Sequence, residues 1–318
     1  MDPNVDPHPD SVVGLDNAKA EIALAANALN DPNRFLPYKP WRTFLLHGVI
    51  GSGKKLFAQS FSPKYDVRII HASIVTVNVG HVSGLFAWYT ALPESRVIIL
   101  NDVEQMLGVG STLVVHPTAK SELLAAINCF RDVLVIGITR SPWLLDEAVL
   151  RHFDRHLHIH LPNHPNRVQM VCQKISPFTH EIHEADVWDM MQHFEDISGS
   201  MIDDAIRGVL MYKYQEARGA THFRKVEGQG GKLWACNEED LGSEKYNYTQ
   251  GPWRVSLNPI TIADLTDFLR LIVRGSSPLK EAEEKHERWN AKPFQGEETG
   301  ESLKAASQSA DEIFHVQF

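Results

Sequence analysis

Gly48-Val-Ile-Gly-Ser-Gly-Lys54-Lys55 is the stretch that decides the fold, because it fits the phosphate-binding loop pattern G-x-x-x-x-G-K-[ST] everywhere except its last position. In that pattern, glycines let backbone N–H groups close around phosphates, the lysine neutralises them, and the final hydroxyl ligates Mg²⁺. Lys55 replaces that hydroxyl, so the sequence predicts a phosphate site with an altered metal position. The predicted nucleotide-binding residues within the loop are Gly48, Gly51, Ser52, Gly53, Lys54 and Lys55.

The residues on either side of the loop support this interpretation. The apolar run Thr43-Phe-Leu-Leu-His47 predicts a buried strand before the loop, and residues 56–61 predict the start of a helix after it. The order of strand, loop and helix is the context that phosphate binding needs. A glycine-rich turn without a ligand is the alternative, and we favour it less.

The bulk composition indicates a globular protein with protein partners. The 318 residues suffice for two domains, and 43% of them are hydrophobic and 22% charged. The net charge of −9 argues against broad binding to nucleic acid or anionic membrane, although a local basic patch stays open. Three scattered cysteines suggest neither a disulfide framework nor a thiolate metal site. No apolar run reaches the roughly 18–20 residues of a membrane span, so we expect a cytoplasmic protein.

Four further apolar runs, at residues 67–70, 97–100, 133–136 and 157–161, alternate with segments of helical character. This alternation predicts a parallel sheet covered by helices on both faces. After a proline-marked boundary, apolar residues recur at helical spacing. We predict a flexible tail (1–11), a large α/β domain (12–162), a helical lid domain with a loop or strand insertion near 227–259 (163–290), and a polar, disordered tail (291–318).

The order of these features resembles an AAA ATPase. The motifs that carry the resemblance are the phosphate-binding loop, Val13-Gly-Leu-Asp-Asn-Ala-Lys19, Ser141-Pro-Trp-Leu-Leu-Asp146, Arg151-His-Phe153 and Ser198-Gly-Ser200. The chain is most similar to the meiotic clade of katanin, spastin and the vacuolar-sorting ATPase, and closest to the last of these. The resemblance implies a P-loop AAA domain with a C-terminal helical lid, ATP or ADP between them, and assembly into hexameric rings.

The sequence departs from this family at the end of the strand at residues 97–100. The family has an aspartate for the Mg²⁺ shell and a glutamate that activates water, whereas this chain has Asn101 and Asp102. Asp102 then stands at the position of the base, with a side chain one methylene shorter than glutamate. If the alignment is instead shifted by one residue, Asp102 is the metal carboxylate and Val103 stands at the base position. Residues 77–80, which align with the substrate-gripping pore loop, carry no aromatic side chain.

Two more departures concern basic residues. Arg140 occupies the position of the family's polar sensor, and the paired arginine fingers become Arg151 and His152. Lys55 and Arg140 each add a positive charge and Asn101 removes a negative one, a shift of about three units that is comparable with the charge of a bound Mg²⁺. We therefore hypothesise that ATP or ADP binds without metal, with Lys55 and Arg140 in place of the ion. Simple decay of the site is the alternative.

The run His156-Leu-His-Ile-His-Leu161 places three histidines on one face of a strand. Imidazoles at this spacing suit zinc, but a solvated face is favoured because no nearby cysteine or carboxylate completes a site. No metal ligand is assigned. Trp289, in a charge-rich helix, is expected to anchor that helix on the large domain.

The preferred function is that of a nucleotide-binding pseudo-ATPase related to the vacuolar-sorting ATPase, acting as a regulatory subunit or scaffold. Its expected partner is itself or an active AAA paralogue in a ring, and a peripheral role at endosomal membranes fits the family. The candidate catalytic residues are Asp102 and Arg151. Two alternatives stay open: a low-activity ATPase that remodels protein assemblies in membrane trafficking, and an interaction module that binds no nucleotide.

Overall fold

The computed structural model describes residues 12–30, 40–61, 66–71, 96–108, 120–121, 123–125, 127, 133–225, 232–236, 239, 244–245, 254–275 and 279–291. Within these ranges, no helix combines the length and the apolar character that crossing a bilayer requires. The pore-loop segment at residues 77–80 and both predicted tails, apart from Ala291, lie outside the described residues.

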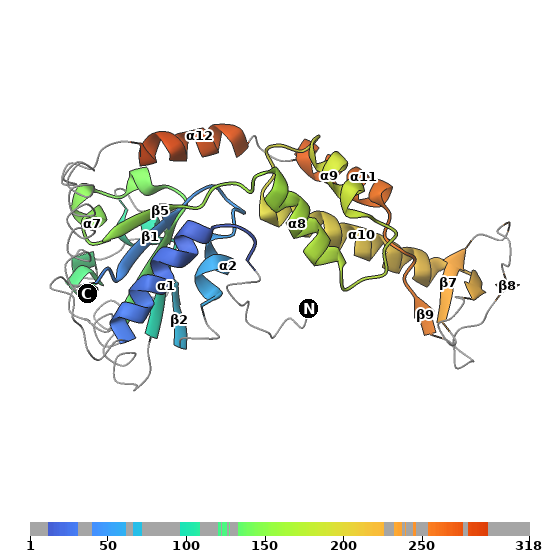
Figure 1. The fold of residues 1–318 in the computed structure, drawn as a ribbon, viewed down its shortest axis with the longest axis horizontal. Coiled ribbons are helices and arrows are strands. Elements are labelled where there is room, and N and C mark those ends of the chain that lie inside the picture. The colour runs from blue at the N-terminus through green and yellow to red at the C-terminus, as the bar shows by residue number, and fades with distance from the viewer. Residues whose placement is uncertain are drawn as a thin grey trace, which may run out of the picture.

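Five parallel strands form the central sheet, in the order β2-β3-β4-β1-β5 (Figure 1). This confirms the α/β fold with a parallel sheet that the apolar runs predict. The strands are β1 (Thr43–His47), β2 (Asp66–His71), β3 (Arg96–Asn101), β4 (Val133–Thr139) and β5 (Arg155–His158). The last strand begins and ends earlier than predicted, although the Ile159 N–H still donates to His47 O at 2.8 Å.

Both faces of the central strands β1, β3 and β4 are buried, which explains why these strands are continuous apolar runs. On β1, Phe44 and Leu46 face one hydrophobic cluster, while Leu45 faces another. The first cluster includes Ile22 of α1 (Asp16–Asn30) and Phe57 of α2 (Lys54–Gln59). The second is closed by α5 (Val103–Leu107), by Leu145, which follows the short helix η2 (Pro142–Leu144), and by α7 (Glu147–Leu150), together with helical residues among 120–127.

A third hydrophobic cluster lies among the helices after β5. These helices are α8 (His164–Ile175), α9 (Glu184–Met191), α10 (Gly199–Gly219) and α11 (Ile262–Gly275). Asn163 caps α8 and Ser198 caps α10, each accepting a hydrogen bond from a backbone N–H of the first turn. Because this cluster is separate from the two at the sheet, it supports the division near residue 162, which stays a prediction.

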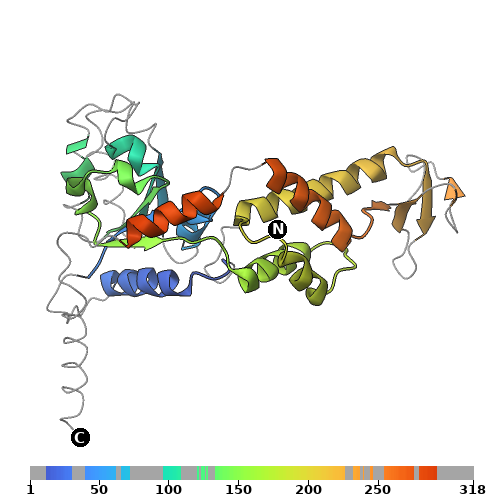
Figure 2. The same cartoon turned by 90° about the horizontal axis from the view of Figure 1, so that it is seen from above.

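The inserted segment forms a small sheet in the order β8-β6-β7-β9 at the far end of α10 (Figure 2). Its strands are β6 (His222–Lys225), β7 (Lys232–Cys236), β8 (Glu244–Lys245) and β9 (Arg254–Ser256). The insertion near 227–259 therefore contains the strands β7, β8 and β9, and β6 lies just before it. This sheet lies away from the central sheet and the loop that follows β1.

The last described helix, α12 (Leu279–Asn290), returns to the central sheet after α11 (Figures 1 and 2). Trp289 packs against the cluster that contains Leu45, and its ring meets His47 edge to face with centroids 4.8 Å apart. The predicted anchoring role of Trp289 is therefore confirmed. The Lys285 ammonium adds a contact 3.7 Å from the centre of the Trp143 ring.

Candidate nucleotide site

The loop at residues 48–53 connects β1 to α2, as the sequence predicts. Gly51 and Gly53 have φ values of +78° and +91°, a region that only glycine adopts readily. The loop also meets the start of α10, where the Ser200 N–H donates to Gly51 O at 3.2 Å. The phosphate-binding loop is thus in contact with the helices after β5, and Gly51 lies at that contact.

Lys54 is the first residue of α2, and only 6% of its surface is exposed. Its Nζ donates to Gly48 O and Val49 O, both at 2.7 Å, so the ammonium closes the loop from inside. Burial, aided by the positive charge of Arg140, lowers the pKa of Lys54 to about 8. Phosphate oxygens next to this ammonium would favour its charged form and raise that pKa again.

This change in pKa predicts how nucleotide affinity depends on pH. Below about pH 8 Lys54 is already protonated in the free protein, but above it each binding event must also take up a proton. We expect the dissociation constant for ADP in EDTA to rise above pH 8, by up to about tenfold per pH unit. Titrations between pH 7 and 9.5 would measure this. Lys54→Arg, whose side chain stays charged, should give a flat profile, and an equally flat wild-type profile would contradict the proposed contact.

The end of β3 places Asn101 and Asp102 beside Arg140. Asp102 has a φ of +57°, and its Oδ2 accepts a hydrogen bond from Asn101 Nδ2 at 2.8 Å. Arg140 lies with Nη2 3.7 Å from Asp102 Oδ1 and Nε 3.8 Å from Glu104 Oε1, and its backbone N–H donates to the same Glu104 oxygen at 3.3 Å. The Asp102 carboxylate is therefore engaged by an amide on one side and a guanidinium on the other.

The charges of Arg140, Glu104 and Asp102 all act on Lys54, so the structure gathers these groups around the loop. Glu104 is a member of this group that the sequence argument missed. As the second residue of α5, it directs its carboxylate toward the end of β4, where Arg140 begins the connection to η2. Arg140 is thus balanced by two carboxylates, and its charge is less available to phosphate than a count of motif residues suggests.

These residues do not fit the Mg²⁺ shell that the loop pattern implies. Lys55, at the hydroxyl position, is exposed and cationic. Asn101 presents its amide to Asp102, and Asp102 is already beside the Arg140 guanidinium. Mg²⁺ requires oxygen ligands in octahedral geometry, and the positive charges of Lys55 and of Arg140, which lies beside Asp102, oppose it.

Arg151 ends α7, and its side chain pairs with Glu147 one turn earlier. With 63% of its side chain exposed, Arg151 remains accessible to another molecule. No contact with the loop residues is observed among the described side chains, so a role in a neighbouring subunit stays a prediction. The Nδ1–H of His152, beside it, donates to Ala148 O at 2.7 Å.

The histidines of β5 are placed differently from the prediction. His160 is exposed, but only 1% of the His158 side chain is, so a solvated face is wrong for His158. The expectation that no carboxylate lies nearby is also wrong, since Glu283 of α12 lies 3.4 Å from His158 Nε2 and 3.2 Å from His160 Nδ1. Sequence separation concealed this contact, because α12 lies more than a hundred residues after β5.

His47 and His286 complete this buried group. Burial and the neighbouring imidazole of His158 lower the pKa of His47 to about 2, and burial likewise lowers that of His286 to about 4. Burial opposes ionisation of Glu283, but its contacts with His158 and His160 outweigh burial and lower the pKa of the carboxyl to about 2.

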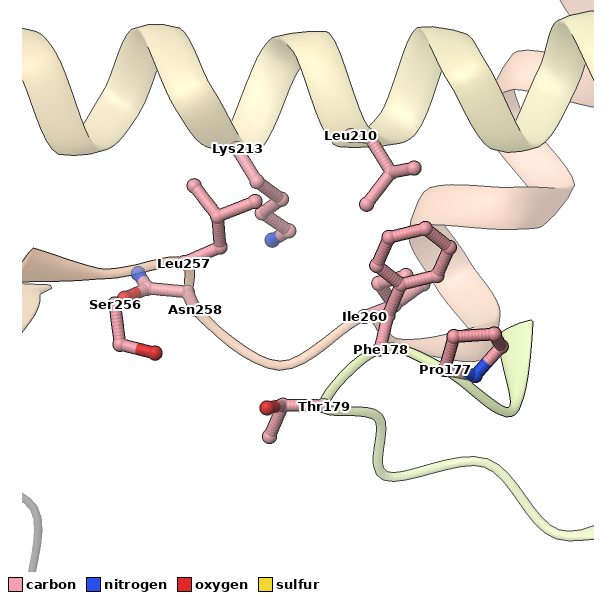
Figure 3. Close-up of a pocket in the computed structure, with 9 residues that line it drawn as sticks. All are labelled: Pro177, Phe178, Thr179, Leu210, Lys213, Ser256, Leu257, Asn258 and Ile260. Carbon is pink, nitrogen blue, oxygen red and sulfur yellow. The ribbon is translucent and has the colours of Figure 1, made fainter. Parts of the chain in front are cut away.

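A shallow pocket lies far from the loop, between α10 and the segments before α9 and α11 (Figure 3). Lys213 points into it from α10, but this ammonium is already paired with Asp264 at 3.1 Å. The pocket therefore offers no free charge to a ligand and is not the nucleotide site.

Comparison with known proteins agrees with this arrangement. Residues 44–161 match the model of the ATPase family associated with various cellular activities, AAA. The chain is 26% identical over 283 residues to human vacuolar protein sorting-associated protein 4A, an alignment that covers 81% of this chain and 64% of that protein. The chain thus spans less than two thirds of this curated relative.

Solved structures show the same fold. The FIGL-1 AAA domain has a TM-score of 0.66 at 21% identity, covering 89% of this chain and 88% of that one. Its complex with ADP gives 0.62 at 22% identity, covering 85% of each. A structure that describes the basis of katanin self-assembly gives 0.63 at 18% identity, covering 88% and 90%. With its phosphate-binding loop, parallel sheet and helices in this order, the chain carries an AAA domain at residues 44–161 and is similar to AAA ATPases of the meiotic clade.

Proposed function

We propose that this protein binds ATP or ADP through its phosphate-binding loop, hydrolyses ATP weakly or not at all, and acts as a regulatory subunit or scaffold. The observation that carries the proposal is the state of the catalytic carboxylate. One oxygen of Asp102 accepts a hydrogen bond from Asn101 and the other is paired with the Arg140 guanidinium, and both contacts lower the basicity of the carboxylate. A base must instead be free to accept a proton from the attacking water.

Nucleotide binding is supported by the retained part of the loop. Gly51, Gly53 and Lys54 keep the backbone shape and the buried ammonium that hold phosphates. Exchange of the two carbonyl contacts of Lys54 for phosphate oxygens would give stronger, charge-assisted hydrogen bonds. The related FIGL-1 domain has been solved with ADP, which supports the same class of ligand here.

The substitutions also support a lower demand for metal. Lys55 is exposed at the start of α2 and can approach phosphate, while Arg140 would have to exchange Asp102 or Glu104 for it. We therefore give Lys55 the larger part in replacing the charge of Mg²⁺. Arg140 then acts mainly by holding Asp102 away from catalysis.

The proposed partners are other AAA chains, either copies of this protein or an active paralogue, in a hexameric ring. The exposed Arg151 could then serve the neighbouring subunit's nucleotide. The katanin structure concerns self-assembly, and the human relative is named for vacuolar sorting, so a cytoplasmic trafficking role at the surface of endosomal membranes is part of the proposal.

A second candidate is a low-activity ATPase that remodels protein assemblies. It is favoured by Glu104, whose Oε2 is buried without a hydrogen-bond partner at the end of β3. Release of Arg140 by a bound γ-phosphate would free both Glu104 and Asp102 at once, restoring a carboxylate near the water position.

The test is a titration of the purified chain with fluorescent ATP, in EDTA and again in Mg²⁺, with phosphate release followed in the same samples. We expect binding in EDTA that Mg²⁺ improves by less than about threefold, with no release above background, because the protein's own cations replace the ion. Binding that requires Mg²⁺, accompanied by release, would contradict the proposal and support the second candidate.

Lys55→Thr sharpens this test because it restores the hydroxyl of the family pattern. We expect weaker binding in EDTA and a larger improvement on adding Mg²⁺ than in the wild type. Lys280→Thr, the same substitution at an exposed position of α12, is the matched control and should change neither value.

A further inference from the structure

Three histidines from distant parts of the chain meet directly behind the phosphate-binding loop. His47 ends β1 and His158 ends β5, and the two are register partners on neighbouring parallel strands, so their rings lie 4.8 Å apart on one face of the sheet. His286 reaches them from α12, with its Nδ1 3.2 Å from His47 Nδ1. All three are buried, with His47 at 0% and His286 at 1% exposure and the His158 side chain at 1%.

The nitrogen atoms of this group lie close enough to share one ion. One ligand atom from each of the three histidines falls within 4.8 Å of the others. Tetrahedral zinc with Zn–N bonds of about 2.0–2.1 Å places its nitrogen ligands about 3.3 Å apart. The contact between His47 and His286 already has this length, and rotation of the side chains would bring the third imidazole to the same point.

Buried polar atoms in the group lack hydrogen-bond partners. His47 Nε2, both ring nitrogens of His158 and Glu283 Oε2 are buried and make no hydrogen bond. His158 Nε2 approaches Glu283 at 3.4 Å, but without the alignment of a hydrogen bond. Buried polar atoms in folded proteins are nearly always satisfied, so several unsatisfied atoms at one place point to a missing partner.

Glu283 supplies a carboxylate at the same place. It precedes His286 by three residues on α12, a spacing that puts both side chains on one face of the helix. It also forms a second set of potential ligands with His158 and His160, and His158 belongs to both sets. The two sets share only His158, so Glu283 would reach the same ion by rotation of its side chain. Three imidazoles and a carboxylate would then make a complete tetrahedral set for zinc, whereas Mg²⁺ and Ca²⁺ prefer oxygen ligands alone.

We propose that His47, His158 and His286, with the carboxylate of Glu283, bind a divalent transition-metal ion, for which Zn²⁺ is the best match. The ion joins the carboxyl ends of β1 and β5 to α12. Gly48 follows His47 directly, and His286 also contacts the backbone of Arg140, so the ion fixes α12 against the loop and the sensor position. With Glu283 turned onto the ion, all four ligands would come from the protein and the buried histidines would keep solvent away from it, as in a structural site.

The test measures Zn²⁺ binding itself and does not depend on nucleotide. The full chain, stripped of metal with a chelator and dialysed, is titrated with Zn²⁺ against a chromogenic indicator, and its melting temperature is followed with and without the ion. We expect one tightly bound Zn²⁺ per chain and a higher melting temperature in its presence. Failure of nucleotide binding would leave this result unchanged, so the two proposals can fail separately.

His158→Asn and His286→Asn should each weaken Zn²⁺ binding by at least about a hundredfold and abolish the rise in melting temperature. His193→Asn, the same change at an exposed histidine after α9, is the control and should bind like the wild type. Unchanged Zn²⁺ affinity in both core variants would overturn the proposal.

A measurement on the wild type keeps the proposal testable if the core variants do not fold. Co²⁺ replaces zinc in such sites and absorbs visible light with an intensity that distinguishes four-coordinate from six-coordinate ions. We expect the strong spectrum of a four-coordinate site, lost on adding one equivalent of Zn²⁺. A weak six-coordinate spectrum, or no binding of either ion, would show that the three histidines form a metal-free core and would overturn the proposal.

Discussion

Lys54→Ala is expected to weaken ATP and ADP binding by at least about tenfold, and by up to about a hundredfold, in EDTA and in Mg²⁺ alike. The ammonium of Lys54 is buried inside the loop and makes two charge-assisted hydrogen bonds with backbone carbonyls. Its exchange onto phosphate would supply about 1.5–3 kcal/mol of binding free energy, the usual range for hydrogen bonds to charged groups. Fluorescent-nucleotide titration measures the loss directly.

Two variants make the result specific. Lys54→Arg retains the charge, but its larger guanidinium fits the buried position of the ammonium less well. Its affinity for nucleotide should therefore lie between those of the wild type and Lys54→Ala. Lys280→Ala removes one positive charge from an exposed part of α12 and should leave the dissociation constant unchanged. If Lys54→Ala bound nucleotide as tightly as the wild type, the assignment of the phosphate-binding loop would be wrong, and the alternative of a nucleotide-free interaction module would take its place.

The fold was largely predictable because its signals are local. The central strands carry continuous apolar runs that match their burial on both faces, and the loop between β1 and α2 has a glycine pattern with a direct backbone meaning. The helical part was likewise visible in its spacing. The exact bounds of β5 were not predictable, because this strand contains polar histidines and the side chain of one of them, His158, is buried.

The candidate site was only partly predictable, because several of its contacts join distant segments. The role of Arg140 depends on Asp102 and Glu104 at the end of the neighbouring strand, and the motif alone does not show that these carboxylates balance its charge. The burial of His158 depends on α12, which brings Glu283 and His286 from the other end of the chain. The Glu-x-x-His spacing on a predicted helix was a signal that could have suggested this contact.

Gly51→Ala is expected to have the second largest effect, on both stability and nucleotide binding. The φ of +78° is unfavourable for any residue with a Cβ, at a cost of about 1–2 kcal/mol. A Cβ here would also lie 2.2 Å from Ser200 Oγ and 2.6 Å from Ser198 Oγ at the start of α10. We therefore expect the free energy of unfolding to fall by about 2–5 kcal/mol once overpacking is added.

Gly53→Ala separates these two causes, because its φ of +91° is equally unfavourable while nothing lies within 4 Å of its Cβ. It should lose only the conformational part, about 1–2 kcal/mol. Gly219→Ala, at the open end of α10, should have no destabilising effect. Chemical denaturation gives the three free energies, and equal losses for Gly51→Ala and Gly53→Ala would contradict close packing of the loop on α10.

The glycine variants should rank differently in nucleotide affinity than in stability. Both loop variants displace backbone N–H groups that the phosphates need, so each should weaken ADP binding by at least about tenfold. The clash at Gly51 additionally pushes the loop away from Ser198 and Ser200, the contact through which the helices after β5 would sense an occupied loop. We therefore expect ADP to raise the melting temperature of the wild type and Gly219→Ala but not that of Gly51→Ala. A normal rise in Gly51→Ala would show that the loop binds phosphate without this contact.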